Sequence, residues 1–258
     1  PVLRSAEVAV AGPRDGTARR PLTIKVQVRG KGALRLRVTE PPGQWASAAL
    51  PADGEVEVLP ARRGVVEAVV VELRSAAPLG LIPWRRVLTA RLAHPVDVGP
   101  MPLDTEVHLR RGRVSGAGDT TTRGFAEDDV RGARDYVAGD PLRLIHWHAT
   151  ARTGELMVKE LEAPARAGIA VIVDLRSSRP EDNEEAAGRA AGIALGALRN
   201  GIPVTLLTAE AAGPVVGSAD SPSAVSRRLA RAIDGVAPPD GPIPPGAGVV
   251  RVTPPGVR

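Results

Sequence analysis

Residues 169–174 read I-A-V-I-V-D, an unbroken apolar run that ends in a carboxylate. Such a run, without polar alternation, is typical of a strand buried on both faces of a parallel sheet. The acidic segment 182–185 then opens a helical stretch that continues to Asn200-Gly201, and Val204 begins the next apolar run. This succession of strand, helix and strand predicts an α/β domain of doubly wound type.

The same pattern continues towards the end of the chain. Ser221-Pro222 opens a second predicted helix, and a last strand is expected at 249–253. The helix has one apolar face, made of Val225, Leu229, Ala232 and Ile233. We therefore expect its arginines to lie on the opposite, solvent-facing side: Arg227, Arg228 and Arg231.

The first hundred residues carry the period-2 pattern of half-buried strands. Apolar and polar residues alternate over 22–29 and again over 34–39, with Gly30-Lys31-Gly32 between them as a predicted hairpin turn. Further strands are expected at 6–11, 54–59, 65–73 and 85–92, and the proline-studded segment 94–102 is the expected connector. These signals predict two domains, an Ig-like β-sandwich over 1–98 and the α/β domain over 99–258.

Composition excludes some classes of function. The 258 residues include no Cys, which excludes disulfides and thiolate chemistry, and no apolar run reaches the roughly 20 residues that span a bilayer. The net charge of +5 reflects either an Arg-rich amino-acid usage or a basic surface that attracts nucleic acid or acidic lipid. One Tyr, one Phe and three Trp provide few stacking platforms, which disfavours binding of single-stranded nucleic acid.

Residues 134–152 read R-D-Y-V-A-G-D-P-L-R-L-I-H-W-H-A-T-A-R and concentrate the polar and aromatic residues of the chain. Two interpretations stay open: a polar-aromatic knot that stitches the fold, or a surface that recognises a partner. The arginines of this segment suit phosphate binding, but they suit equally well bidentate pairing with Asp140, Asp135 or Glu160 inside the fold.

Two places in the sequence suggest a metal site. Asp174 follows a predicted strand, where ligands bind in doubly wound sheets, and Asp174 with Ser178 forms part of a D-x-S-x-S pattern suited to Mg²⁺. Arg176 stands at the middle ligand position, and we expect it to pair with Asp174 in place of a cation. If His146 and His148 lie on a strand, they point the same way and share a metal with Asp140 or Asp135.

Evidence for catalysis is weak, because no H-E-x-x-H zinc motif, nucleophile elbow or phosphate-binding loop is present. We therefore favour a non-enzymatic function. The alternatives are a metal-dependent hydrolase using His146, His148 and Asp140, and a module that binds anionic lipid or nucleic acid through Arg227, Arg228 and Arg231. The second alternative predicts a steep loss of binding as salt increases.

The pattern Arg134-x-Tyr136-x-x-Gly139-Asp140-x-x-Arg143-x-Ile145-x-Trp147-x-x-x-Ala151-Arg152, followed by Leu156-x-Val158-x-Glu160, resembles the signature of domain-of-unknown-function family 58. The resemblance is tightest over 124–178. It implies a von Willebrand factor A-like domain encoded beside MoxR-type AAA+ ATPases, with a metal-dependent adhesion site at Asp174 and Ser178 that Arg176 makes degenerate. The short stretch after Asp174 predicts an abbreviated form of this fold.

The resemblance also implies two transmembrane helices before the β-rich region, so that the chain, which begins at Pro1, is a fragment of a membrane-anchored protein with this region in the cytoplasm. We expect a non-enzymatic adaptor that engages a MoxR-type AAA+ ATPase in the assembly or maturation of other complexes. Its recognition surface is formed or braced by Asp140, Arg143 and Trp147. The remaining signature residues are Arg134, Tyr136, Gly139 and Arg152.

Overall fold

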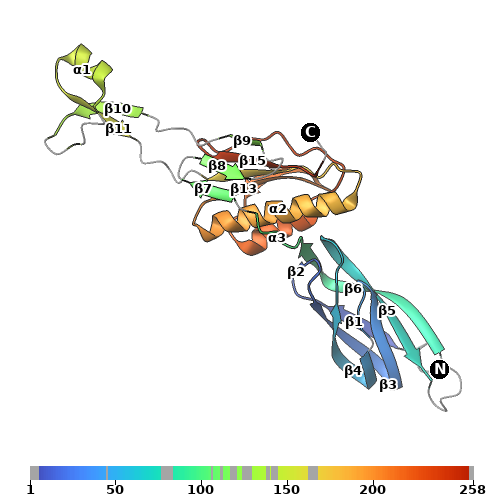
Figure 1. Cartoon of the computed structure of the whole chain (residues 1–258). Helices are drawn as coiled ribbons and strands as arrows, with labels where there is room; N and C mark the ends of the chain where they lie inside the picture. Colours follow the sequence, from blue (N-terminus) through green and yellow to red (C-terminus); the bar gives the residue numbers. More distant parts are fainter. Residues whose placement is uncertain are drawn as a thin grey trace.

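The chain folds into a large β-sheet region followed by a smaller α/β region, as seen in a computed structural model (Figure 1). The structure describes residues 6–44, 46–76, 84–105, 107–110, 113–116, 121–123, 130–137, 140, 145–161 and 168–255. None of the described helices is both long and apolar enough to cross a lipid bilayer.

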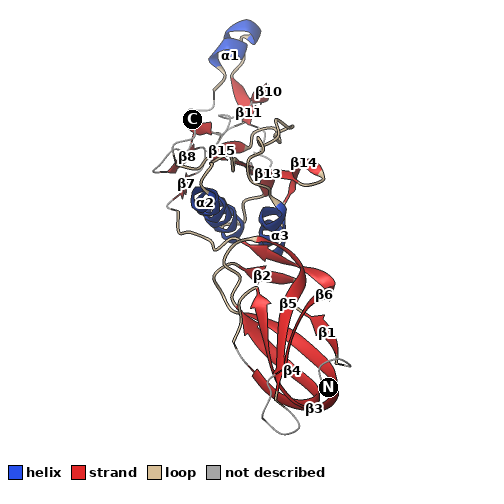
Figure 2. Cartoon of the chain, turned by 90° about the vertical axis from the view of Figure 1, so that its right-hand side faces the viewer, coloured by secondary structure: helices blue, strands red, loops and turns tan. Residues whose placement is uncertain are grey.

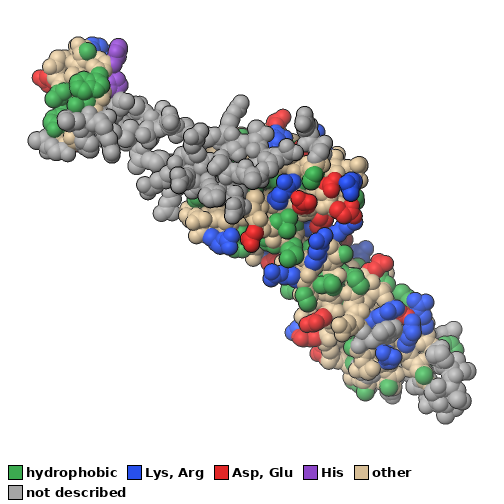
Figure 3. Space-filling model, in the orientation of Figure 1, with side chains coloured by type: hydrophobic (Ala, Val, Ile, Leu, Met, Phe, Trp, Pro, Cys, Tyr) green, Lys and Arg blue, Asp and Glu red, His purple; other side chains and the backbone are tan. Residues whose placement is uncertain are grey.

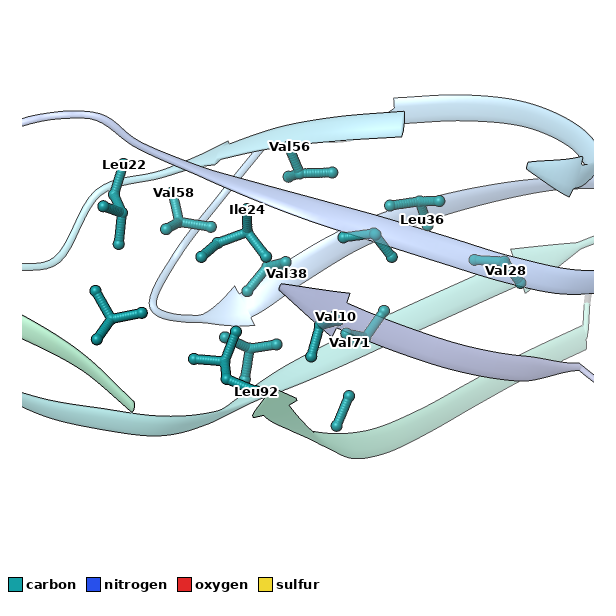
Figure 4. Close-up of a cluster of buried hydrophobic side chains, with 14 of the residues drawn as sticks. Val10, Leu22, Ile24, Val28, Leu36, Val38, Val56, Val58, Val71 and Leu92 are labelled. Atoms are coloured by element: carbon teal, nitrogen blue, oxygen red, sulfur yellow. The ribbon is translucent and has the colours of Figure 1, made fainter. Parts of the chain in front are cut away.

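Six strands form the N-terminal sheet, in the order β1-β3-β5-β6-β2 with β4 on the other side of β3. Their bounds are β1 Glu7–Ala11, β2 Asp15–Thr17, β3 Leu22–Glu40, β4 Ala46–Val58, β5 Gly64–Ser75 and β6 Trp84–Gly99. Because β1 pairs with both β3 and β6, the sheet curls until it nearly closes. Every second side chain of β3 is buried over residues 22–28 and again over 34–38, and Figure 4 shows several of these Val, Leu and Ile side chains packed together between the strands.

The β-rich N-terminal region is confirmed, but its construction differs from the expected one. Hydrogen bonds join all six strands into one curled sheet, where we expected two separate sheets. The prediction of a hairpin turn at Gly30-Lys31-Gly32 is wrong, because β3 continues through these residues. Gly30 and Gly32 instead have positive φ values of 157° and 109°, and the register with β4 shifts between Val28 and Gly32. The prediction of a connector over 94–102 is also wrong for residues 94–99, because β6 extends to Gly99.

The second region is built on a five-stranded mixed sheet with the order β14-β13-β12-β15-β9. The bounds are β9 Thr121–Arg123, β12 Ile169–Val173, β13 Val204–Glu210, β14 Gly213–Ser218 and β15 Gly248–Val252. The central strand β12 is parallel to both β13 and β15, and all five of its residues are buried. The apolar run at 169–173 thus forms the predicted buried parallel strand.

Two helices cover one face of this sheet: α2 (Pro180–Arg199) and α3 (Pro222–Arg231) (Figures 1 and 2). Ser221 caps α3 as predicted, by accepting a hydrogen bond from the Ala224 N–H. Both helices pack on the side of β12 that carries Ile169, Val171 and Val173. In the described part of the chain, the helices on both faces that define a doubly wound fold are therefore not seen. A separate small hairpin is formed by β7 (Val107–Arg110) and β8 (Arg113–Gly116).

Ion pairs between distant parts of the chain join the two regions. Arg63, in the turn between β4 and β5, binds Glu184 of α2 and Asp234 beyond α3. In α3, Arg227 binds Asp15 of β2, and Arg231 binds Asp97 of β6. The second region therefore rests on the β2–β6 end of the N-terminal sheet (Figure 2).

Candidate interaction site

The signature segment folds as a small unit of its own, the β10–α1–β11 unit. Strand β10 (Val130–Asp135) pairs antiparallel with β11 (Met157–Leu161), and α1 (Trp147–Thr153) lies in the connection between them. Figures 1 and 2 show this unit beyond the second region, away from the N-terminal sheet.

Local hydrogen bonds fix where α1 begins and ends. The His146 Nδ1 atom accepts a hydrogen bond from the Ala149 N–H at 3.1 Å, and the His146 N–H donates to the Met157 carbonyl of β11 at 2.8 Å. Gly154 ends the helix with a φ of 79°, which favours glycine at this position. The condition for a metal shared by His146 and His148, that both lie on a strand, is not met. His146 caps the helix and His148 lies within it, and residues two apart on a helix do not face each other.

A bidentate ion pair closes the connection after β10. The Arg134 guanidinium donates two hydrogen bonds of 2.7 Å to the Asp140 carboxylate, which also accepts one from the Val137 N–H at 3.0 Å. These bonds lower the pKa of Asp140, mainly through the hydrogen bond from Arg134. The sequence left two roles open for Arg134, phosphate binding and pairing with a carboxylate. In the structure it pairs with Asp140. Gly139 and Arg143 lie outside the described residues.

The signature divides into buried and exposed side chains. Ile145, Ala149 and Val158 are buried, and Ile145 forms an antiparallel β-bridge with Val158 of β11. The backbone N–H of half-buried Tyr136 bonds to the Leu156 carbonyl at 2.9 Å. By contrast, the Trp147 side chain is 68% exposed, and Arg152 and His148 are exposed as well.

Exposed apolar side chains give the β10–α1–β11 unit a partly hydrophobic surface. Besides Trp147, Val137 is 63% exposed and Leu156 is 44% exposed. Figure 3 shows hydrophobic side chains gathered on the surface of this unit. A contiguous patch of large apolar side chains is typical of surfaces that contact another molecule. The sequence identified Trp147 as a candidate, but Val137 and Leu156 were missed because their exposure depends on how the hairpin folds.

At the carboxyl end of β12, Asp174 is 1% exposed and is held by Arg176. The guanidinium donates bonds of 2.9 Å and 2.6 Å to the two carboxylate oxygens, and Asp174 in turn raises the pKa of Arg176. The expected Asp174–Arg176 pair is thus confirmed, while Ser178 is exposed. Within the described parts of the chain, no three His, Asp or Glu side chains are grouped closely enough to hold a metal ion. A cation at Asp174 has to displace Arg176.

The loop after Asp174 is held by Asp182 and Asn183, two residues of the segment that was predicted only to open the following helix. The Asn183 side chain both accepts from the Ser177 N–H and donates to the Ser177 carbonyl, each at 3.0 Å. The Ser177 hydroxyl donates to Asp182 at 3.0 Å. A polar pair at the start of a predicted helix, shortly after a Ser in the preceding loop, is the signal that points to such a clasp.

Of the three arginines of α3 that we expected on the solvent-facing side, Arg231 is 53% exposed, Arg227 is 39% exposed and Arg228 is only 17% exposed. Each one binds an acidic side chain: Arg227 binds Asp15, Arg228 binds Glu210 and Arg231 binds Asp97. Arg228 also donates to the Val215 carbonyl at 2.9 Å. These ion pairs occupy the guanidiniums that the alternative of an anionic lipid- or nucleic-acid-binding module relies on.

Comparison with known protein families agrees with the signature. The family model described as "Protein of unknown function DUF58" matches residues 132–247. No curated protein and no solved structure matches the chain significantly. The matched range begins within β10 and ends just before β15, so it contains the Arg134–Asp140 pair, α1 and the Asp174–Arg176 pair. The chain therefore carries a domain of the DUF58 family at residues 132–247.

Proposed function

We propose that this chain is the interaction part of a non-enzymatic adaptor, and that its β10–α1–β11 unit binds a MoxR-type AAA+ ATPase. The observation that carries this proposal is the 68% exposure of Trp147 within a family signature. Trp and Arg supply the largest contributions at protein interfaces, commonly about 2 kcal/mol or more each.

The buried and exposed halves of the signature have different tasks in this proposal. Ile145, Val158 and the Arg134–Asp140 pair hold α1 against the hairpin, which fixes the direction of Trp147. Trp147, Val137 and Leu156 then make the contact. A side chain that is held in place before binding loses less conformational entropy when the complex forms, so this bracing favours tight binding.

In the same proposal the second region is an abbreviated von Willebrand A-like domain and the N-terminal sheet is Ig-like. The parallel order β13-β12-β15, with Asp174 at the carboxyl end of the central strand, supports the first assignment. Arg176 takes the place of the cation in this degenerate adhesion site. The full-length protein is anchored in a membrane by segments outside this chain, with the present region on the cytoplasmic side, and it serves complex assembly or maturation.

Direct binding to a MoxR-type ATPase of the same organism, measured with ATP and with ADP, tests the proposal. We expect nucleotide-dependent binding that Trp147→Ala weakens by about 30-fold, since about 2 kcal/mol corresponds to that factor. Trp84→Ala is the matched control, because Trp84 is 51% exposed but lies in the N-terminal sheet.

Asp140→Ala separates bracing from contact. It removes the partner of Arg134 while leaving Trp147 in place, so we expect weaker binding together with a less stable β10–α1–β11 unit. Trp147→Ala should weaken binding without this loss of stability, because its side chain is mostly in solvent. Absence of binding in both nucleotide states, or equal binding by wild type and Trp147→Ala, would overturn the proposal.

A further inference from the structure

His146 fixes the start of α1, the helix that presents Trp147. It is the N-cap residue of this helix, and its Nδ1 atom accepts a hydrogen bond of 3.1 Å from the Ala149 N–H. Trp147 is the first residue of the helix, directly after the cap. The direction of the exposed Trp147 side chain therefore depends on the turn that His146 caps.

A histidine can cap this turn only while its imidazole ring is neutral. A ring nitrogen that accepts a hydrogen bond carries no proton, so the neutral ring holds its proton on Nε2. Protonation makes both ring nitrogens donors, and the Ala149 N–H then loses its acceptor. Ala149 is buried, so this loss is costly. The new positive charge also lies at a helix N-terminus, where the helix dipole disfavours a cation.

Two hydrogen bonds to β11 do not involve the ring. The His146 N–H donates to the Met157 carbonyl at 2.8 Å, and the Met157 N–H donates to the Thr150 hydroxyl oxygen at 3.0 Å. Both bonds are compatible with a protonated ring, so they keep the helix attached to the hairpin. The change that protonation brings is therefore confined to the first turn of α1, which carries Trp147.

The ring lies where it can exchange protons with water. His146 is half-buried, and Figure 3 shows histidine side chains at the surface of this unit. The other charged or titratable side chains described in the unit are Arg134, Asp135, Tyr136 and Asp140 in and after β10, and His148, Arg152 and Glu155 in and after α1. Histidine is the only side chain that ordinarily changes its charge between about pH 5 and 8, so within this set His148 needs a control.

We propose that His146 is a pH-sensitive positioning residue, which holds the first turn of α1 and Trp147 at about pH 8 and releases them as the pH falls towards about 5. Because the ordered turn requires the neutral ring, the contribution of the cap is complete at the alkaline end of this range. It is lost as the ring takes up a proton. Binding through Trp147 is then weaker at acidic pH, a consequence that rests on the function proposed above.

Amide exchange of the whole chain, followed by NMR, tests the cap without any partner. The exchange rate of the Ala149 N–H is measured at about pH 8 and about pH 5, and each rate is compared with that of an unstructured chain at the same pH. This comparison gives the protection of the amide. We expect the protection to be about 5-fold lower at the acidic pH, the factor that corresponds to about 1 kcal/mol for a lost N-cap.

His146→Asn separates capping from titration, because an Asn side chain caps a helix but does not titrate. Its Ala149 protection should stay at the wild-type alkaline value at both pH values, while His146→Ala should show the lower protection at both. His148→Asn is the matched control and should keep the wild-type pH dependence. The proposal is overturned if wild-type protection does not change with pH, if it changes equally in His146→Asn, or if His148→Asn abolishes the change.

Binding to the MoxR-type ATPase at the same two pH values then connects the cap to the proposed function. The ratio of wild-type affinity to His146→Asn affinity cancels any pH dependence of the ATPase itself. We expect this ratio to fall about 5-fold at the acidic pH, and a constant ratio contradicts a role of the cap in binding. If the Ala149 protection responds as expected but the ATPase binds at neither pH, the proposed function fails while the pH-sensitive cap stands.

Discussion

The surroundings of each guanidinium decide what an arginine does in this molecule. Arg63 is 4% exposed and binds two carboxylates, so it acts as a buried link between the two regions. Arg134 is 43% exposed and forms a two-bond fork with Asp140, so it closes a local loop. Arg85 is 63% exposed and shares the buried carboxylate of Glu72 with two other arginines. Arginine therefore has three roles in this chain: it links the two regions, it closes a local loop, and it shares a buried carboxylate with other arginines.

The Arg134–Asp140 clamp predicts a pH dependence at acidic pH. Because the folded state lowers the pKa of Asp140, the clamp contributes its full stability above the unfolded-state pKa of about 4. This contribution is lost as pH falls through the folded-state pKa. We expect the NMR signal of the Val137 N–H, which bonds to Asp140, to move as the solution is acidified below about pH 4.

In Asp140→Asn this acidic shift of the Val137 signal should disappear, because the amide does not titrate. Asp135→Asn, which changes a neighbouring exposed acid outside the clamp, should leave it intact. If the signal titrates equally in Asp140→Asn and in wild type, the clamp does not exist in solution as described.

At the scale of elements, α2 is shaped by its small residues. Its buried face consists largely of alanine and glycine, which lets the segment after β6 cross the helix at close range. The Leu103 N–H donates to the Gly188 carbonyl at 3.0 Å. A Cβ atom on Gly192 would lie 1.9 Å from the Leu103 carbonyl oxygen, which is far inside contact distance. Glycine is thus required at 192 for packing and not for backbone conformation.

We predict that Gly192→Ala destabilises the chain by about 1 to 3 kcal/mol, the usual cost of forcing extra atoms into a packed site. This loss should outweigh the gain of up to about 1 kcal/mol from the higher helix propensity of alanine. Urea unfolding measures the net effect.

Gly196→Ala, one helical turn further along α2, is the matched control. The nearest atom to its Cβ would be Arg199 Nη2 at 3.9 Å, an ordinary contact, so here the propensity gain should prevail. Equal effects of the two substitutions would contradict the close crossing at Gly192.

Elements that depend on local signals were predictable from the sequence. The strand at Ile169–Val173 and the cap at Ser221 follow from neighbouring residues alone. The turn at Gly30-Lys31-Gly32 was wrong because glycines permit both a turn and a register shift within a strand. β3 pairs with β4 on both sides of the glycines, and this pairing keeps the chain extended there. Pairing with a strand further along the chain cannot be predicted from neighbouring residues.

The candidate site shows the same limit. The sequence identified the signature and the Asp174–Arg176 pair, whose members are two residues apart. It missed the ion pairs of the α3 arginines because their partners are remote: Asp15 lies 212 residues from Arg227, and Asp97 lies 134 residues from Arg231. The sequence also did not predict which signature residues are buried and which are exposed, because exposure depends on how the β10–β11 hairpin folds.

At the scale of the whole molecule, ion pairs are prominent between the N-terminal sheet and the α/β region. They cluster at two places, around the turn that carries Arg62 and Arg63, and around α3. Ion pairs need specific geometry, so they fix the orientation of the two regions more narrowly than a smooth apolar contact of the same size would.

Neighbouring residues Arg62 and Arg63 allow this interface to be tested with a built-in control. Arg63→Ala leaves Glu184 and Asp234 without their shared cation, and Glu184 is only 13% exposed, so we expect a loss of about 3 kcal/mol. Arg62 pairs with Glu181 where both side chains are more than half exposed, so Arg62→Ala should cost less than about 1 kcal/mol. Urea unfolding followed by probes in each region should also show the two transitions separating in Arg63→Ala, because the regions lose their main buried link. If both substitutions cost the same and the transitions stay together, the buried link does not hold the regions.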